Sequence, residues 1–274
     1  MLFADQDLAR RLERTEGQAN ANFVEARRRQ FPDSGAEWLT VAGAYAMFDG
    51  ADSPLTQSFG LGLFGPVYAP DLARMESFFT AHGAPVYHEV SPLAELGLLV
   101  QLPARGYRPL EYTNVLYRPL SPAHAAPVST SPELITRPIT PAETMLWAQT
   151  SAAGWATESF EASDFMLAYG QLSASSAGTV PFLVELAGQP IATGGLFMHE
   201  GVALLIGAST VASGRRQGAQ SALLAARLHH AAQQGCTLAM MGAVPGSQSQ
   251  RNAEKNGFRI AYTRIKWQLE SPSQ

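Results

Sequence analysis

The sequence is nearly devoid of cysteine and of lysine. Cys236 is the only cysteine among 274 residues, which excludes an intramolecular disulfide framework and any thiol-rich metal site. No apolar run approaches the roughly 18–20 residues that a membrane helix needs. The N-terminal residues mix acids and arginines with apolar residues, unlike a secretory signal. We therefore expect a cytoplasmic protein without a metal site and without a membrane partner.

A surplus of charge of one sign is also absent. The chain has 19 basic and 23 acidic residues, for a net charge of −4. Because nucleic-acid binding usually needs a concentrated basic face, no nucleic-acid partner is predicted. Apolar residues make up 46% and charged residues 15% of the chain, which supports a substantial core. At roughly 150 residues per domain, the length fits two domains or one large one.

A segment rich in proline, serine and alanine divides the chain. Residues 119–132, PLSPAHAAPVSTSP, have no apolar periodicity, and such segments stay extended. We therefore expect a first domain at 1–120, a linker at 121–131 and a second domain at 132–274.

Each part has an α+β pattern of elements. In the first, Leu72, Met75, Phe78 and Phe79 form one apolar helical stripe. The expected helices are 7–30 (one or a pair), 71–81 and one near Leu96, with strands at 38–48, 56–64, 85–90 and 107–117. In the second part we expect helices at 141–149, 218–233 and from Ser249, a loop-rich stretch at 151–176, and strands at 182–186, 191–199, 202–211, 237–243 and 258–269.

The two parts also show a sequence echo. The segment Gly106-Tyr107-Arg108 corresponds to Gly257-Phe258-Arg259 at an offset of 151 residues, and PVYHEV (85–90) then falls on CTLAMM (236–241). An ancient duplication explains this echo, and two similar α+β units that arose by chance are the alternative.

The most informative segment is LLIGASTVASGRRQGAQSALL, residues 204–224. A buried-looking strand ends at Val211, a loop with Arg215, Arg216 and Gly218 follows, and an Ala/Leu-rich helix begins at once. The first turn of a helix has unpaired N–H groups and partial positive charge, and glycine lets the backbone approach a ligand. The pattern predicts an anion site of the phosphate or pyrophosphate kind. A plain turn with two solvated arginines is the alternative.

In its order of elements, the second part resembles the GCN5-related N-acetyltransferase superfamily. The resemblance covers about residues 132–270, more weakly 35–120, and is most specific in STVASGRRQGAQSALLAARL and SQSQRNAEKNGFRIAYTR. It implies a mixed α+β fold of two related domains, each with a central, mostly antiparallel, splayed sheet flanked by helices. It also implies acetyl-coenzyme A as cosubstrate, an amine as acceptor, and a monomer or homodimer.

By position, the resemblance assigns the cofactor to the strand end and the loop after it. Ser209, Thr210 and Val211 correspond to the strand end, where a backbone N–H would donate to the acetyl carbonyl in an oxyanion-type contact. The pyrophosphate loop corresponds to Arg215, Arg216, Gln217, Gly218, Ala219, Gln220 and Ser221. The family has glycine or alanine where this chain has Gln220, whose side chain we expect to point away from the phosphate.

The catalytic positions depart from the family's pattern. Many members have a tyrosine as general acid four residues before the glycine-aromatic pair, where this chain has Ala253. Ser249 fits a common variant, and it either caps the short helix or hydrogen-bonds the cofactor. Asn252 faces either coenzyme A or solvent. No general base is visible in the strand, and the weak candidates elsewhere are Glu158, Glu161, Asp164, His199 and Glu200.

The first domain shares the arrangement but lacks the arginine-glycine loop. Its counterpart reads LGLFGPVYAPDL, and Asp71 at the helix start would repel a phosphate. We expect a degenerate domain that binds no coenzyme A and shapes the acceptor site. The whole chain is then expected to be an N-acetyltransferase that acts on a small molecule or an amino-terminal group by direct attack. A non-catalytic acyl-coenzyme A-binding or sensing protein is the alternative.

Overall fold

The chain divides into two compact units. The computed structural model describes residues 3–121, 133–156 and 163–270. One unit comprises Met1–Arg118 with Met240–Gln274, and the other comprises Pro119–Ala239. The expected cut near residue 120 coincides with the start of the second unit, but the expected domain 132–274 does not keep its C-terminal segment. Most of the expected linker, residues 122–131, lies outside the described residues.

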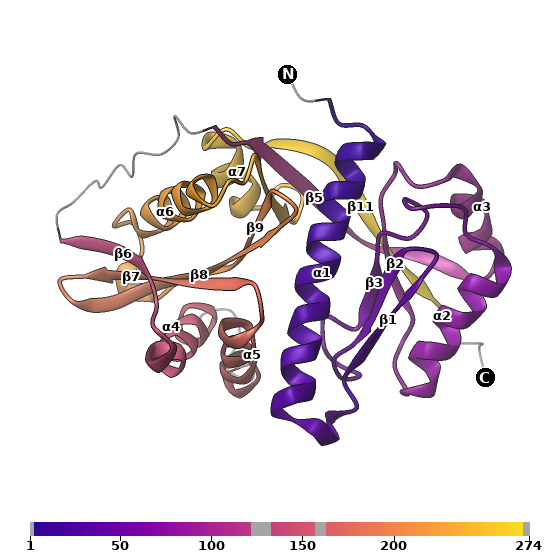
Figure 1. The fold of residues 1–274 in the computed structure, drawn as a ribbon, viewed down its shortest axis with the longest axis horizontal. Helices are drawn as coiled ribbons and strands as arrows, with labels where there is room; N and C mark the ends of the chain where they lie inside the picture. Colours follow the sequence, from indigo (N-terminus) through magenta and orange to yellow (C-terminus); the bar gives the residue numbers. More distant parts are fainter. Residues whose placement is uncertain (1–2, 122–132, 157–162, 271–274) are drawn as a thin grey trace. The chain divides into compact units, whose positions relative to one another are not determined.

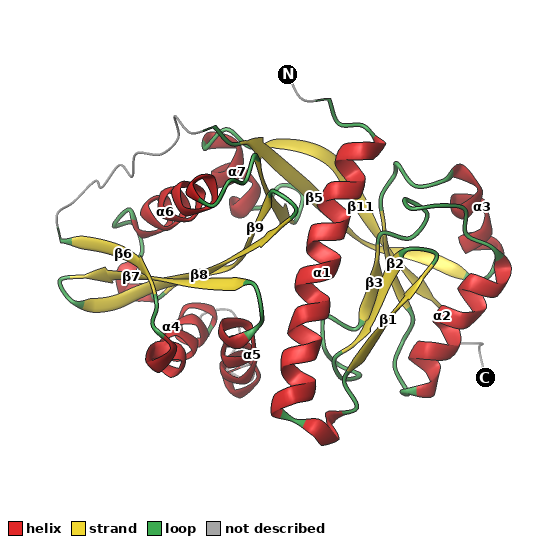
Figure 2. Ribbon diagram, in the orientation of Figure 1, coloured by secondary structure: helices red, strands yellow, loops and turns green. Residues whose placement is uncertain are grey.

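The first unit is built on a mostly antiparallel sheet (Figures 1 and 2). In spatial order its strands are β1 (Glu37–Val41), β2 (Ala44–Phe48), β3 (Gln57–Phe59), β4 (Tyr87–Val90), β11 (Arg259–Leu269), β5 (Tyr107–Pro119) and β10 (Leu238–Ala243). Strand β3 pairs with β4 in parallel. The helices are α1 (Gln6–Gln30), α2 (Ala69–Ala81), α3 (Leu96–Ala104) and α7 (Gln248–Lys255).

The last strand explains why the C-terminal segment belongs to the first unit. Strand β11 pairs antiparallel with β4 along one edge, where Ile265 faces Val90, and with β5 along the other. Backbone hydrogen bonds on both edges tie the segment to these neighbours, and sequence order carries no information about such pairing. The C-terminal segment, which was expected to be part of the second domain, therefore pairs with strands of the first unit.

The sequence echo corresponds to recurring elements. At an offset of 151 residues, β4 matches the start of β10, and α2, α3 and β5 match the starts of α6, α7 and β11 within one residue. Strands β5 and β11 are thus equivalent, pair with each other, and each lies beside the preceding strand of the other repeat. These matches favour duplication over chance similarity.

The second unit has an antiparallel sheet of four strands among its described residues. Their order is β9 (Val202–Thr210), β8 (Gln189–His199), β7 (Thr179–Leu186) and β6 (Leu134–Pro138). Its helices are α4 (Thr144–Trp155), α5 (Ser163–Ser175) and α6 (Ala219–Gln233). The α+β class is thereby confirmed. The expected loop-rich stretch 151–176 is wrong, because it contains the end of α4 and all of α5. Gly170 of α5 allows close packing against α4, because a Cβ there would lie 3.1 Å from Cα of Ala148.

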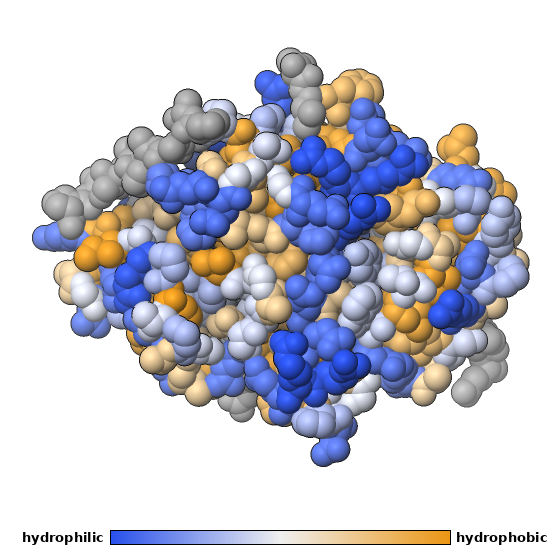
Figure 3. Space-filling model, viewed as in Figure 1, coloured by the Kyte–Doolittle hydropathy of each residue, from blue (hydrophilic) through white to orange (hydrophobic). Residues whose placement is uncertain are grey.

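Local patterning in the first unit was predicted well, with two exceptions. The apolar stripe on α2 is buried in the core, and the arginine-rich segment is the single helix α1, whose outer face is hydrophilic (Figure 3). The expected strand 38–48 is instead the hairpin β1–β2, which turns at Ala42 (φ 48°) and Gly43 (φ 79°). The expected strand 56–64 shortens to β3, because Gly60 adopts a left-handed conformation (φ 82°).

Candidate functional site

The strand end β9 leads into a tight turn before α6. The N–H of Val211 donates to the carbonyl of Ile191 over 2.9 Å, and the N–H of Gly214 then donates to the carbonyl of Val211 over 2.9 Å. A Cβ at Gly214 would lie 2.7 Å from Cβ of Ile191, so only glycine fits at this close approach. The chain therefore turns back against β8 and presents the next residues to solvent.

The loop that follows is exposed and has two residues in left-handed conformations. Arg216 and Gly218 both adopt left-handed conformations, with φ of 61° and 82°. For arginine this conformation costs about 1–2 kcal/mol, and such strain is typical of functional loops. Arg215, Arg216, Gln217 and Gly218 are all exposed. The side-chain amide of Gln217 donates to the carbonyl of Ser213 over 2.7 Å and so fixes the loop from within.

The first turn of α6 has the composition of an anion site. Gly218 is the N-cap, no side chain caps the helix, and the first turn contains no acidic residue. The first helical hydrogen bond runs from Ala222 to the carbonyl of Gly218 over 3.0 Å. The N–H groups of Ala219, Gln220 and Ser221 therefore precede the helical ladder, where the macrodipole favours an anion. Arg215 and Arg216 add positive charge to the same loop.

The backbone N–H groups of Thr210 and Val211 point in opposite directions. Residues opposite each other in an antiparallel ladder alternate between hydrogen-bonded and non-hydrogen-bonded pairs. Because Val211 donates to Ile191, and Ala192 faces Thr210, the N–H of Thr210 points away from β8. Val211, whose N–H is already used by Ile191, is therefore not the donor expected at this strand end, and the N–H of Thr210 is directed to the edge of β9 away from β8.

Two side chains at this strand end have structural roles. Ser209 is buried, and its hydroxyl donates to the carbonyl of Ser151 and shares a hydrogen bond with Thr193. The amide of Gln220 donates to the hydroxyl of Thr210 over 2.6 Å. The side chain of Gln220 thus turns back to the strand end, a contact that the sequence analysis did not predict.

Helix α4 approaches the same strand end closely. A Cβ at Gly154 would lie 2.5 Å from Oγ of Ser209 and 3.0 Å from the backbone nitrogen of Thr210. Glycine at this position lets α4 approach the backbone of Thr210 without a steric clash. This contact was not predicted, because the segment was expected to be a loop.

The residues expected near the cofactor's sulfur lie on α7, in the other compact unit. Ser249 is exposed in the first turn, and the N-cap is Ser247, whose hydroxyl accepts from the N–H of Gln250 over 3.2 Å. Asn252 is exposed and accepts from Gln248 over 2.7 Å. Ala253 is buried. The expected cap at Ser249 is therefore wrong.

The candidate bases gain no support. His199 and Glu200 belong to the β8–β9 turn, at the opposite end of β9 from Thr210. At about 3.3 Å per residue, the strand separates them from that end by roughly 25 Å. Glu158 and Glu161 lie outside the described residues, and Asp164 belongs to α5.

The corresponding helix start in the first unit, that of α2, has an acidic residue. The carboxylate of Asp71 accepts the N–H of Tyr68 over 2.9 Å at the beginning of α2. A carboxylate thus occupies the end of the helix that would otherwise attract an anion. This contact favours the expectation that the first domain does not bind coenzyme A.

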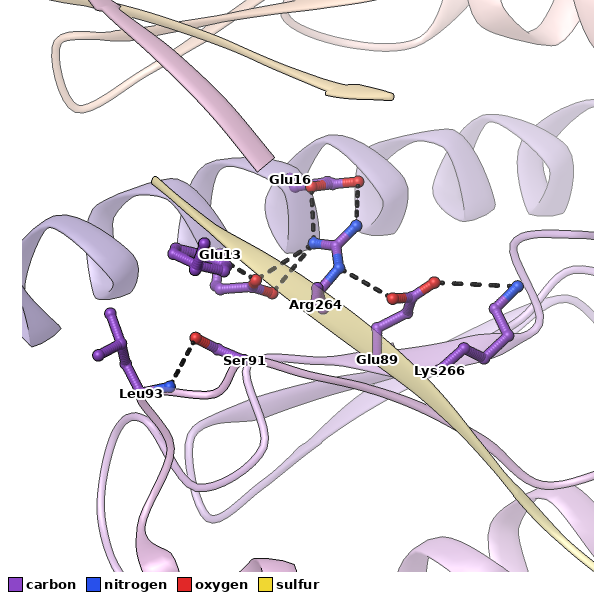
Figure 4. A network of polar contacts seen from close by, with 8 residues as sticks. Glu13, Glu16, Glu89, Ser91, Leu93, Arg264 and Lys266 are labelled. Carbon is purple, nitrogen blue, oxygen red and sulfur yellow. Dashed lines mark hydrogen bonds and ion pairs between the residues drawn. The ribbon is translucent and has the colours of Figure 1, made fainter. Parts of the chain in front are cut away.

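Beside β3, β4 and β11, the first unit also contains a buried charge cluster that the sequence did not predict (Figure 4). The Arg264 guanidinium contacts the carboxylates of Glu13, Glu16 and Glu89 over 2.9–3.3 Å and lies 4.7 Å from the centre of the Phe59 ring. By the offset of 151 residues, Phe59 is the equivalent of Thr210. A salt-bridged guanidinium therefore lies against the side chain of this equivalent residue.

The part of the chain that the structure describes contains neither a metal-binding cluster nor a membrane-spanning helix. Among the described residues, no group of three or more His, Cys, Asp or Glu is placed to hold a metal ion. No helix in the described ranges is both long and apolar enough to cross a membrane.

Comparison with known proteins identifies the fold. No family model and no curated protein matches the sequence. Among solved structures, a GCN5-related N-acetyltransferase from Kribbella flavida matches with a TM-score of 0.64 at 18% identity, over 92% of this chain and 96% of that one. A functionally unknown conserved protein from Staphylococcus epidermidis ATCC 12228 matches with a TM-score of 0.62 at 7% identity, over 89% and 98%.

A tandem protein of the same kind, from the clavulanic acid biosynthesis pathway and solved without acetyl-coenzyme A, matches over 100% of this chain and 98% of its own. Its TM-score is 0.60 at 13% identity. At these identities the likeness is one of fold, and it agrees with the resemblance found in the sequence. The chain therefore has the fold of the GCN5-related N-acetyltransferase superfamily.

Proposed function

We propose that this protein is an acyl-coenzyme A-dependent N-acyltransferase that transfers an acetyl group to an amine, either of a small molecule or of an amino terminus. The observation that carries the proposal is the α6 start, which has no side-chain cap, no acid and two exposed arginines in its loop. These features fit a pyrophosphate, which needs backbone N–H donors and positive charge.

Two groups of residues would bind the cosubstrate, one at its pyrophosphate and one at its thioester. Arg215, Arg216 and the backbone of residues 217–221 would hold the pyrophosphate. The N–H of Thr210 would donate to the thioester carbonyl and stabilise negative charge on its oxygen, an effect typically worth a few kcal/mol. The acceptor nitrogen attacks the carbonyl carbon, the C–N bond forms, the C–S bond breaks, and the thiol departs with a proton.

The expected positions offer neither a general acid nor a general base for the transfer. Ala253 provides no proton, and the strand end has no carboxylate or imidazole. Rate enhancement would then come mainly from orientation of the two reactants and from the carbonyl contact. A role for Ser249 or Asn252 at the sulfur, and a cytoplasmic monomer or homodimer, remain predictions.

Calorimetry with acetyl-coenzyme A tests the binding step. The wild type is expected to bind, and the double variant Arg216→Glu, Gly218→Trp is expected to lose at least tenfold in affinity. The matched control is Arg29→Glu, the same charge reversal at an exposed arginine of α1. Absence of binding to the wild type, or equal affinity of the double variant, would refute the proposal.

A non-catalytic acyl-coenzyme A-binding or sensing protein is the second candidate, favoured by the buried Ala253. Release of free thiol in the presence of a broad panel of amines separates the two. Turnover with any amine supports the transferase, whereas tight binding with no turnover on the panel supports the sensor.

A further inference from the structure

The second unit contains a buried positive charge that the proposed function does not use. Arg227, in the third turn of α6, is 3% exposed. Within the part of the chain that the structure describes, it forms no ion pair, and burial lowers the pKa of its guanidinium to about 10. A buried cation without a carboxylate partner is costly, so its hydrogen bonds identify what it does.

The hydrogen bonds of Arg227 are made to backbone carbonyls of two neighbouring strands. Its Nη1 donates to the carbonyl of Gly195 on β8 over 3.0 Å and, at the long limit of 3.5 Å, to that of Ile206 on β9. Its Nε donates to Leu223 of its own helix over 3.3 Å. Gly195 and Ile206 face each other in the ladder, so the guanidinium spans one strand pair.

This pair is the last regular one before a β-bulge. The register changes from Gly195 facing Ile206 to Thr193 facing Ser209, so one residue of β8 lies opposite two of β9. Gly207, one of the two, has φ of 58°. A Cβ at Gly194 would lie 2.9 Å from Nη1 of Arg227, so glycine there leaves room for the guanidinium.

The bulge decides which N–H groups of the strand end leave the ladder. Without the extra residue, the register of β9 would shift by one, and Thr210 would face Ile191 in place of Ala192. A shift of one residue exchanges the hydrogen-bonded and non-hydrogen-bonded positions. The N–H of Thr210 would then donate to β8 and would no longer be available to a ligand.

We propose that Arg227 is a positioning residue, which holds the β9 bulge in register and so keeps the N–H of Thr210 available to an acyl carbonyl. This inference rests on the proposed function, because the carbonyl is that of the bound thioester. The planar guanidinium suits the task because its N–H donors are fixed relative to one another, whereas the ammonium of lysine is a point charge.

The test is Arg227→Lys, with Arg137→Lys as the matched control in the same unit, where the arginine pairs with Glu143 and Glu185. Circular dichroism and thermal unfolding verify that each variant is folded. Calorimetry gives the affinity for coenzyme A itself, which lacks the acyl group. Infrared spectroscopy of acetyl-coenzyme A labelled with carbon-13 at the carbonyl reports the hydrogen bond to that oxygen.

The wild type and Arg137→Lys are expected to lower the carbonyl stretching frequency on binding. Arg227→Lys is expected to keep the affinity for coenzyme A within about threefold, to lose most of the frequency shift, and to lower kcat at least tenfold with little change in KM. A folded Arg227→Lys protein with the wild-type frequency shift and kcat would overturn the proposal.

A second variant covers the case in which Arg227→Lys does not fold. Gly194→Ala keeps the arginine, but its Cβ would lie 2.9 Å from Nη1 and would displace the guanidinium from the Gly195 carbonyl. It is expected to give the same loss of the frequency shift. An unchanged shift in folded Gly194→Ala would again overturn the proposal. The proposed function fails if the wild type binds no acetyl-coenzyme A. The proposal about Arg227 fails alone if the wild type binds it and the folded variants keep the wild-type frequency shift.

Discussion

Glu13 offers the sharpest test of the charge cluster in the first unit. It is 1% exposed on α1, accepts from the hydroxyl of Tyr262 over 2.9 Å and shares Arg264 with two other carboxylates. Burial raises the pKa of its carboxyl from 4.5 to about 7, against the opposing effect of Arg264. The folded state therefore binds the proton of Glu13 more tightly than the unfolded state does.

The sign of the pH dependence follows from this order. A carboxyl whose pKa is raised on folding contributes stability below its unfolded pKa, and that contribution is lost as pH rises through the folded value. The interval from 4.5 to about 7 corresponds to about 3 kcal/mol, at 1.36 kcal/mol for each pKa unit. Glu13→Gln removes the titration, so it should gain about 3 kcal/mol relative to the wild type between pH 4.5 and pH 8.

The assay is urea unfolding of the full chain at several pH values, followed by tryptophan fluorescence. The matched control is Glu111→Gln, which removes an exposed carboxylate that contacts Lys266 over 3.0 Å and should change stability by no more than about 1 kcal/mol. If the difference between Glu13→Gln and the wild type is the same at pH 4.5 and pH 8, the reasoning about burial is refuted.

Three further outcomes are expected from single substitutions. Arg264→Met leaves three carboxylates without their shared cation and should destabilise the protein by roughly 3–5 kcal/mol in urea unfolding, and a loss under 1 kcal/mol would contradict this. Gly154→Ala places a Cβ 2.5 Å from Oγ of Ser209, so it should lower the free energy of unfolding by roughly 1–3 kcal/mol. It should also weaken acetyl-coenzyme A binding in calorimetry, and unchanged binding would exclude α4 from the site. Asp71→Ala removes the contact with Tyr68 and should cost about 1 kcal/mol by thermal unfolding without creating a second calorimetric binding site, whereas a second site would show that this carboxylate alone prevents binding.

Much of the local structure follows from the sequence. The apolar stripe on α2 has helical spacing, and all four of its residues are buried. The elements around Gly218 are each predicted by local residues. An apolar run precedes the loop, glycine allows its conformation, and alanine and leucine favour the helix that follows. These signals succeed because they depend on neighbours within a few residues. The hairpin at Ala42-Gly43 was missed because alanine in the first turn position is a weak signal for a turn that needs two left-handed residues.

The sequence by itself determined the α+β class, the repeat of 151 residues and the loop with its two arginines. Tertiary structure alone decided that β11 lies between β4 and β5, that Arg264 contacts three carboxylates from distant parts of the chain, and that the N–H of Val211 is used by the carbonyl of Ile191. Strand pairing and bulges are set by hydrogen bonds between segments far apart in the sequence, and no local pattern encodes their register.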